Sequence, residues 1–196
     1  MMNNTTDTDT EPTLSAFAMK LRDRFKEFTG FHRKVVHELG HAVVAIYLEL
    51  PIISVTIEGS GILAGACTYG IRPEDLGNNQ LTADQAVTTA GARVAVVQML
   101  VGHEMTEQEA LCSFDSNHDE YRLDEDNLLG LAKYLNISDA EFDLWRRQQF
   151  SRASEILEIP YVWKTLKLLA KELKREGTLS GTRIREVLDE SRAEEA

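Results

Sequence analysis

Apolar side chains recur every three to four residues over most of the chain, a spacing typical of amphipathic helices. Residues 32–48 differ from the other runs because they are apolar on nearly every side, which predicts a helix buried inside the protein. Helix-starting and helix-ending residues set the bounds of the remaining elements. We expect further helices over residues 14–28, 82–100, 138–157 and 161–176, another ending near Tyr134, and a last one from Ser180 to about Glu190.

A short region after the buried helix follows a different period. Every second residue is apolar over residues 52–58, which is typical of a half-buried strand. A glycine-containing turn follows, and residues 62–69 are expected to form a second strand. The pattern therefore predicts a mainly α fold with a small β-sheet over residues 52–69, an α+β architecture.

The two ends of the chain show less apolar periodicity than its middle. Residues 1–12 are rich in Thr, Asn and Asp and lack apolar periodicity, so we predict a disordered acidic tail. One domain is expected over residues 13–190, with a short tail over residues 191–196. Within the domain, capping boxes at residues 82–85 and 138–141 predict the starts of two helices.

Composition narrows the partners that we expect. The formal net charge is −11, from 21 basic and 32 acidic residues, which disfavours binding to nucleic acid or to anionic membranes. The longest apolar stretch, residues 42–53, is too short to span a bilayer and is interrupted by Glu49 and Pro51. No secretory pattern opens the chain, so we expect a cytoplasmic protein whose two cysteines, Cys67 and Cys112, are reduced.

The buried helix carries the sequence His37-Glu38-Leu39-Gly40-His41. Helical residues four apart differ by about 40° in direction and about 6 Å along the axis, so both imidazoles can reach one ion. Zinc binds neutral imidazole readily, and catalytic zinc sites use three protein ligands and leave one position for water. Glu38 points to the side of this pair, where it is expected to act as the general base toward a water molecule that the metal activates.

The alternative interpretation of this motif is two histidines packed in a helix without a metal. The apolar surroundings argue against it, because buried histidines and a buried glutamate need polar partners, which a metal supplies. Gly40 costs about 1 kcal/mol relative to alanine inside a helix, and the close approach of another backbone would explain its presence. The cysteines have no spacing typical of metal ligands, and we expect both to pack as apolar residues.

Other features of the sequence limit the class of zinc peptidase. The extended motif with a third histidine is missing, because Tyr47 and Val44 occupy its required positions, and Glu49 lies too far along the helix to bind the same ion. The chain instead resembles the peptidase domain of FtsH-type ATP-dependent zinc proteases. The resemblance extends over most of residues 30–190 and is carried by the HELGH motif, the strand and Gly-rich turn over residues 54–68, the Ala90–Ala95 helix segment and the final helix pair.

The resemblance implies a zincin-like zinc endopeptidase that acts on peptides or unfolded protein segments. The chain has no Gly-rich phosphate loop, so an unfolding motor would have to be a separate ATPase chain. The hexamers of the family form largely through the missing ATPase module, which leaves small homo-oligomers as an expectation. By analogy, the strand over residues 53–57 is expected to bind substrate by pairing with it along its edge.

The resemblance also implies an aspartate as the third zinc ligand, at the start of a later helix. The inward stripe formed by Leu128 and Leu131 continues back to Asp124, which makes Asp124 the preferred ligand. Asp126 is the second choice, and Asp119 and His118 remain open. The alternative function is a non-proteolytic zinc-bound interaction or regulatory module, and a metal-free relic of a peptidase is a third, weaker interpretation.

Overall fold

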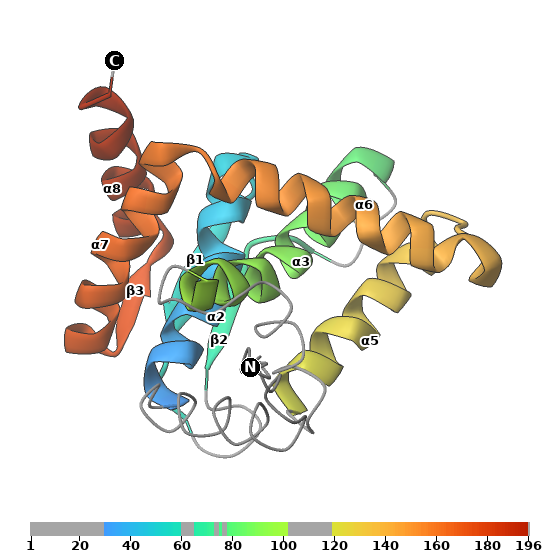
Figure 1. Ribbon diagram of the computed structural model, residues 1–196, viewed down its shortest axis with the longest axis horizontal. Coiled ribbons are helices and arrows are strands. Elements are labelled where there is room, and N and C mark those ends of the chain that lie inside the picture. Colours follow the sequence, from blue (N-terminus) through green and yellow to red (C-terminus); the bar gives the residue numbers. More distant parts are fainter. Residues whose placement is uncertain (1–29, 60–64, 73–74, 76–77, 102–118, 196) are drawn as a thin grey trace, which may run out of the picture.

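The computed structural model describes residues 30–59, 65–72, 75, 78–101 and 119–195 of the chain. The expected α+β architecture is confirmed within these residues, since helices predominate and one small antiparallel sheet accompanies them (Figure 1). The predicted tail over residues 1–12 and the predicted helix over residues 14–28 lie outside the described residues. In chain order the elements are α2 (Gly30–Tyr47), β1 (Ile52–Thr56), β2 (Ala66–Tyr69), α3 (Asn79–Val101), α5 (Asp119–Tyr134), α6 (Asp139–Leu157), α7 (Pro160–Glu176), β3 (Thr178–Ser180) and α8 (Gly181–Ala193).

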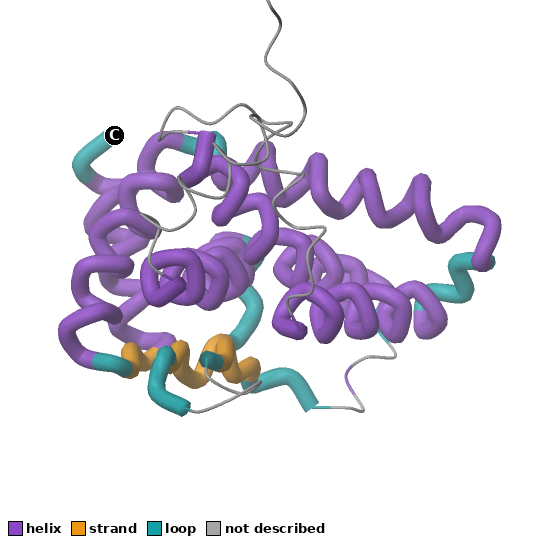
Figure 2. Tube along the Cα trace, turned by 60° about the horizontal axis from the view of Figure 1, so that its bottom comes forward, coloured by secondary structure: helices purple, strands orange, loops and turns teal. Residues whose placement is uncertain are grey.

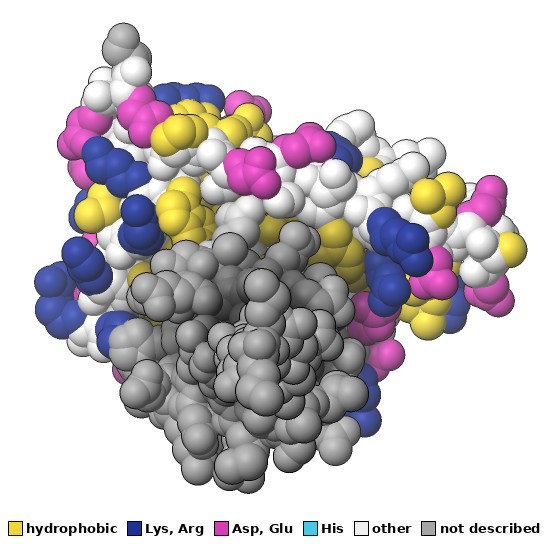
Figure 3. Space-filling model, viewed as in Figure 1, with side chains coloured by type: hydrophobic (Ala, Val, Ile, Leu, Met, Phe, Trp, Pro, Cys, Tyr) yellow, Lys and Arg dark blue, Asp and Glu magenta, His cyan; other side chains and the backbone are white. Residues whose placement is uncertain are grey.

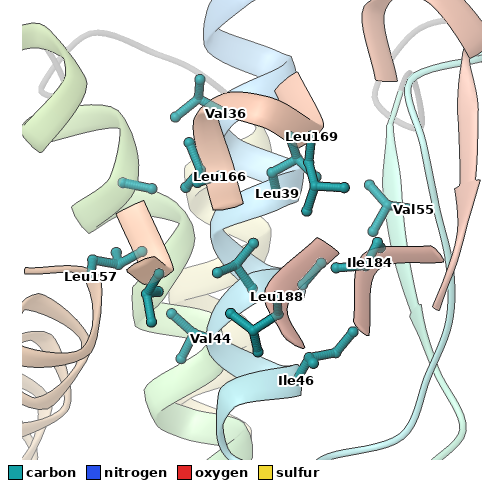
Figure 4. Packing of buried hydrophobic residues seen from close by; sticks show 14 of the residues in the cluster. Val36, Leu39, Val44, Ile46, Val55, Leu157, Leu166, Leu169, Ile184 and Leu188 are labelled. Carbon is teal, nitrogen blue, oxygen red and sulfur yellow. The ribbon is translucent and has the colours of Figure 1, made fainter. Parts of the chain in front are cut away.

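Helix α2 lies at the centre of the molecule, as its apolar surface predicts. It packs against α3 on one side and against α7, α8 and the sheet on others (Figure 1). Leu39 and Val44 are fully buried, and Figure 4 shows them among Leu166, Leu169 and other apolar side chains of α7 and α8. Burial of this surface is the main favourable contribution to the stability of the fold.

The sheet lies along one side of the helical body (Figure 2), in the strand order β2-β1-β3. The central strand β1 is antiparallel to both neighbours, and its buried Val55 is opposite Cys67 on β2 and Leu179 on β3. Strand β3 was not predicted from the sequence, because three residues between two helices are too few to show a two-residue period.

Two expected helix starts had different outcomes. The capping box at residues 138–141 is confirmed, with Ser138 as the N-cap of α6. The start predicted at Thr82 is wrong, because α3 begins at Asn79, one turn earlier. The side chain of Asn78 accepts hydrogen bonds from the backbone N–H groups of Gln80 (3.0 Å) and Leu81 (3.3 Å), which provides the N-cap.

The last helix runs further than expected. Ser180 caps α8, as predicted, by accepting a hydrogen bond from the Arg183 backbone N–H. The helix then continues to Ala193 instead of ending near Glu190. Ser191 lies on its buried face, and Arg192 donates a hydrogen bond to the Tyr161 hydroxyl, so contacts with α7 extend the helix.

Helix α5 lies away from the central core and approaches α2 and α3 from the opposite side to α7 (Figure 1). It belongs to a second apolar cluster, in which Leu128 and Leu131 pack with Ala86 of α3. On the face in Figure 3, basic side chains gather over α7 and between α5 and α6. The arrangement places one end of α5 opposite the motif of α2.

Candidate metal centre

The two histidines of the motif lie on the same face of α2. Their ring centroids are 5.0 Å apart, and the ring planes are nearly perpendicular at 87°. Both side chains are buried, with residue exposures of 3% for His37 and 8% for His41. Helical spacing thus brings two imidazoles to one point in an apolar environment, as the motif predicts.

Asp124 of α5 reaches this point from across the molecule. Its Oδ2 lies 3.4 Å from His37 Nε2, and its Oδ1 lies 3.4 Å from His41 Nε2. One ligand atom from each of the three residues lies within 4.8 Å of the others, so the group could hold a metal ion. The structure therefore brings together the two histidines and the aspartate that sequence analysis preferred.

The spacing of these atoms is close to that of a tetrahedral metal site, in which ligand atoms about 2.0–2.1 Å from the ion lie about 3.3 Å from one another. The two 3.4 Å distances involve different oxygens of Asp124, so the three residues also form a charged contact without a metal. Asp124 Oδ2 is also buried and has no hydrogen-bond partner among the described residues, which is the condition expected of an oxygen whose partner is a metal.

The backbone of α3 orients His41. His41 Nδ1 lies 3.1 Å from the carbonyl oxygen of Thr88. Because a carbonyl oxygen can only accept a hydrogen bond, Nδ1 carries the proton and Nε2 is left to face Asp124. Contacts of this kind fix the tautomer and the ring orientation of metal-binding histidines.

Two glycines allow α3 to approach closely enough for this contact. A Cβ atom at Gly40 would lie 2.7 Å from Ala92 Cα and 2.7 Å from the Gly91 carbonyl oxygen. A Cβ atom at Gly91 would lie 2.8 Å from Val44 Cγ2. The close backbone approach proposed for Gly40 from the sequence is therefore confirmed, and the Ala90–Ala95 segment of α3 is the backbone that approaches.

Burial and neighbouring charges shift the pKa values of the two histidines in opposite directions. Burial, followed by the nearby His41, lowers the pKa of His37 to about 3. Burial also opposes charge on His41, but the Asp124 carboxylate outweighs it and raises the pKa of His41 to about 9. Burial likewise opposes charge on Asp124, whereas His41 and His37 hold the pKa of this carboxyl below its ordinary value. Without a metal, one imidazole is neutral and the other shares a proton with the carboxylate.

Glu38 lines the same cavity as the three candidate ligands. The cavity has a volume of about 500 Å³ and lies between α2, α3, α5 and β2. The carboxylate of Glu38 lies against the backbone of Gly65, where an added Cβ atom would be 2.7 Å from Glu38 Oε1. The carboxylate therefore lies beside the ligand group and outside it.

The other candidate ligands are not brought into the group. Asp126 also lines the cavity, but its side chain is exposed and does not join the three clustered residues. His118 and the side chain of Asp119 lie outside the described part of the chain, as does Cys112. Cys67 lines the cavity without joining the ligand group, and burial raises the pKa of its thiol.

The expected role of β1 in substrate binding is wrong. Both edges of β1 are occupied, by β2 and by β3, so a peptide cannot pair with it. The pairing with β3 was not predictable, because β3 comes from the far end of the chain. Strand β2 is instead an edge strand of the described sheet, and Gly65, Cys67 and Tyr69 on and beside it line the cavity.

Searches for similar proteins give no relatives to compare with this site. No model of a known protein family matches the chain, and no curated protein sequence does so either. Within the described residues, every helix is too short or too polar to cross a membrane. Function is therefore inferred from the geometry of the cavity.

Proposed function

We propose that the chain is a zinc-dependent endopeptidase that hydrolyses peptide bonds in peptides or unfolded protein segments. The observation that carries the proposal is the convergence of His37, His41 and Asp124 beside Glu38 in one cavity. The three ligand residues match the number that catalytic zinc sites use. The resemblance to FtsH-type peptidases supports the same assignment and adds the preference for unfolded segments.

Each protein group has a defined task in this reaction. Zinc, when bound, polarises the peptide carbonyl and makes a water molecule acidic enough to lose a proton near neutral pH. Glu38 accepts that proton as the water oxygen bonds to the carbonyl carbon. Glu38 then returns the proton to the peptide nitrogen as the carbon–nitrogen bond breaks, so the carboxylate is regenerated with each turnover.

The substrate peptide needs a binding surface beside the cavity. We place it along the outer edge of β2, in place of the originally expected β1, because β2 borders the cavity. Main-chain hydrogen bonds to such an edge bind extended peptides with little dependence on their sequence. A folded protein offers few free extended segments, so a separate ATPase chain would widen the range of substrates; a homo-oligomer is a further expectation.

The proposal is tested with the Glu38→Gln variant of the full chain. The probe is fluorescein-labelled casein, a largely unfolded protein, and zinc content is measured by elemental mass spectrometry. We expect about one zinc per chain in both proteins and at least about a 100-fold lower rate in the variant, since general bases contribute about 10²–10⁴-fold. Glu155→Gln, an exposed change on α6, is the control for loss of one negative charge.

Three outcomes would overturn the proposal. A chain that takes up no zinc when zinc is supplied would exclude the metal centre. A zinc-bound chain that does not cleave casein at all would point to the non-proteolytic interaction module. Cleavage that Glu38→Gln leaves unchanged would show that another group, or a contaminating protease, is responsible.

A further inference from the structure

Strand β2 directs two polar side chains toward the cavity. Successive residues of a strand point to opposite faces, so Cys67 and Tyr69 share one face and Ala66 and Thr68 share the other. The first pair is half-buried and lines the cavity with the candidate metal ligands, whereas the second pair is exposed. The proposed zinc chemistry uses neither Cys67 nor Tyr69, so their presence there needs another explanation.

Tyr69 lines the cavity together with Glu38, Cys67 and Asp124. The neighbouring Cys67 and the carboxylates of Asp124 and Glu38 all disfavour a negative charge on its phenol. Burial is the largest effect and, with Cys67 and these carboxylates, raises the pKa of the phenol well above its ordinary value. The phenol therefore keeps its proton and is a hydrogen-bond donor throughout the neutral range.

Other donors in the cavity wall are less suitable. The hydroxyl of Thr89 already donates to the backbone carbonyl of Gln85 at 2.9 Å. Tyr134 also carries a phenol, but this residue is 59% exposed, and a donor in contact with water contributes less than a buried one. Tyr69 is thus the less exposed of the two phenols among the described cavity residues.

We propose that Tyr69 is a catalytic residue whose hydroxyl donates a hydrogen bond to the carbonyl oxygen of the scissile peptide. This inference rests on the proposed peptidase function. As the water oxygen bonds to the carbonyl carbon, the π electrons of the carbonyl move to its oxygen, and Tyr69 stabilises the negative charge there without giving up its proton. When the carbon–nitrogen bond breaks, the electrons return to reform the carbonyl.

Cys67 acts as a positioning residue in this arrangement. Burial raises the pKa of its thiol, so the thiol also keeps its proton. Its sulfur accepts from the Tyr69 hydroxyl, and because sulfur is a weak acceptor the phenol proton can pass from it to a carbonyl oxygen, which is a stronger one. Cys67 then holds the phenol at the cavity until the scissile carbonyl replaces the sulfur as its acceptor.

The test is the Tyr69→Phe variant of the zinc-loaded full chain. We expect unchanged zinc content and KM for fluorescein-labelled casein, with kcat lower by about 10- to 100-fold, because the bond forms as charge develops in the transition state. A second readout is calorimetric affinity for an N-phosphoryl dipeptide, whose anionic oxygens imitate that charge. This affinity should fall at least tenfold. Tyr161→Phe on α7, which removes a hydroxyl bonded to Arg192, is the matched control.

Variants of Cys67 test the positioning role separately. Cys67→Ser keeps an acceptor for the Tyr69 hydroxyl and should retain the affinity for the N-phosphoryl dipeptide, whereas Cys67→Ala should lose part of it. Casein cleavage that depends on Glu38 and is unaltered in Tyr69→Phe would overturn the role of Tyr69 alone. An N-phosphoryl dipeptide affinity that Tyr69→Phe leaves unchanged would do the same. No cleavage by the wild type would instead overturn the proposed function.

Discussion

Helices α2 and α5 supply the candidate ligands in contrasting ways. Helix α2 is buried on almost every side and carries His37 and His41 at a spacing that one helix alone determines. Helix α5 is more exposed than α2 in its described residues and contributes Asp124 from one inward-facing stripe. Two ligands thus follow from local geometry, whereas the third depends on how a separate element is placed.

The two helices are also held in place by different contacts. Helix α2 contacts α3 backbone to backbone at Gly40, within the main core. Helix α5 depends on the small cluster around Leu128 and Leu131 and on an ion pair between Glu125 and Arg146. Both side chains of this ion pair are still partly open to solvent, which limits its contribution to stability. A metal ion bound by residues of both helices would therefore stabilise α5 more than α2.

The largest expected effect is a difference in zinc affinity between variants of two neighbouring aspartates of α5. Asp124→Ala removes a candidate ligand and should lower zinc affinity by more than the 10–100-fold that loss of an outer partner typically costs, or more than about 3 kcal/mol. Asp126→Ala removes the same charge from an exposed side chain and should change zinc affinity by less than about threefold. Competition with a zinc-binding dye measures both affinities.

Equal losses in these two variants would contradict the assignment, because they would indicate a general effect of negative charge. A loss confined to Asp126→Ala would transfer the ligand role to that residue.

The next effect concerns how tightly each helix is packed. Gly40→Ala in α2 places a methyl group 2.7 Å from the backbone of α3, and neither backbone can move away without disturbing the core. We expect the free energy of unfolding to fall by about 1–3 kcal/mol, together with zinc affinity, since His41 would move from the Thr88 carbonyl. Chemical denaturation of the metal-free and zinc-bound protein measures both changes.

Gly130 of α5 offers the matched substitution. No atom lies within 4 Å of a Cβ added there, so Gly130→Ala should gain helix propensity and stabilise the protein by up to about 1 kcal/mol. Similar destabilisation by both alanines would show that α5 is packed as closely as α2.

The pH dependence of the metal-free protein tests the contact between the two helices directly. The pKa of His41 is raised to about 9, so its stabilising effect is complete below pH 6.5 and is lost as the pH rises through 9. The pKa of His37 is lowered to about 3, so the folded protein holds this imidazole neutral. The free energy of unfolding therefore decreases as the pH falls from 6.5 toward 3. The melting temperature of the metal-free protein should therefore be highest near pH 6–7.

Thermal scans of His41→Gln provide the control. This variant has no titrating group at the position, so the decline between pH 7 and 9.5 should disappear while the decline in acid remains. A wild-type decline at high pH that persists in His41→Gln would assign the effect to other groups.

The contrast between the helices also explains what the sequence could predict. The positions of His37 and His41 follow from the period of a single helix, and the phase of Leu128 and Leu131 was enough to prefer Asp124 over the exposed Asp126. These predictions needed no knowledge of how distant segments pack. The main helices were recovered for the same reason.

Features that depend on tertiary contacts were not predictable. The pairing of β1 with β3 joins segments more than a hundred residues apart in the chain, and it reversed the expectation for substrate binding. The Thr88 contact of His41 involves a backbone carbonyl, which no side-chain pattern reveals. Tyr69 could have been noticed, because it shares one face of an expected strand with Cys67, but its distance from Glu38 in the sequence conceals that both line one cavity.

The smallest expected effect concerns the ends of the same two helices. Both end in a residue with positive φ, Glu49 after α2 (φ 62°) and Asn136 after α5 (φ 57°). In each case the next residue donates a hydrogen bond five residues back, from Leu50 to Ala45 and from Ile137 to Ala132, which is the Schellman arrangement that glycine favours.

Because asparagine tolerates positive φ and glutamate does not, Glu49→Gly should stabilise the protein by about 0.5–1 kcal/mol, whereas Asn136→Gly should change stability by only a few tenths of a kcal/mol. Both side chains are exposed, so packing does not obscure the comparison, and urea denaturation measures both variants. A larger gain from Asn136→Gly would mean that the end of α5, and with it the helix that holds Asp124, is under more backbone strain than the end of α2. The more exposed of the two helices would then also be the more strained, and zinc binding to Asp124 would have to overcome that strain.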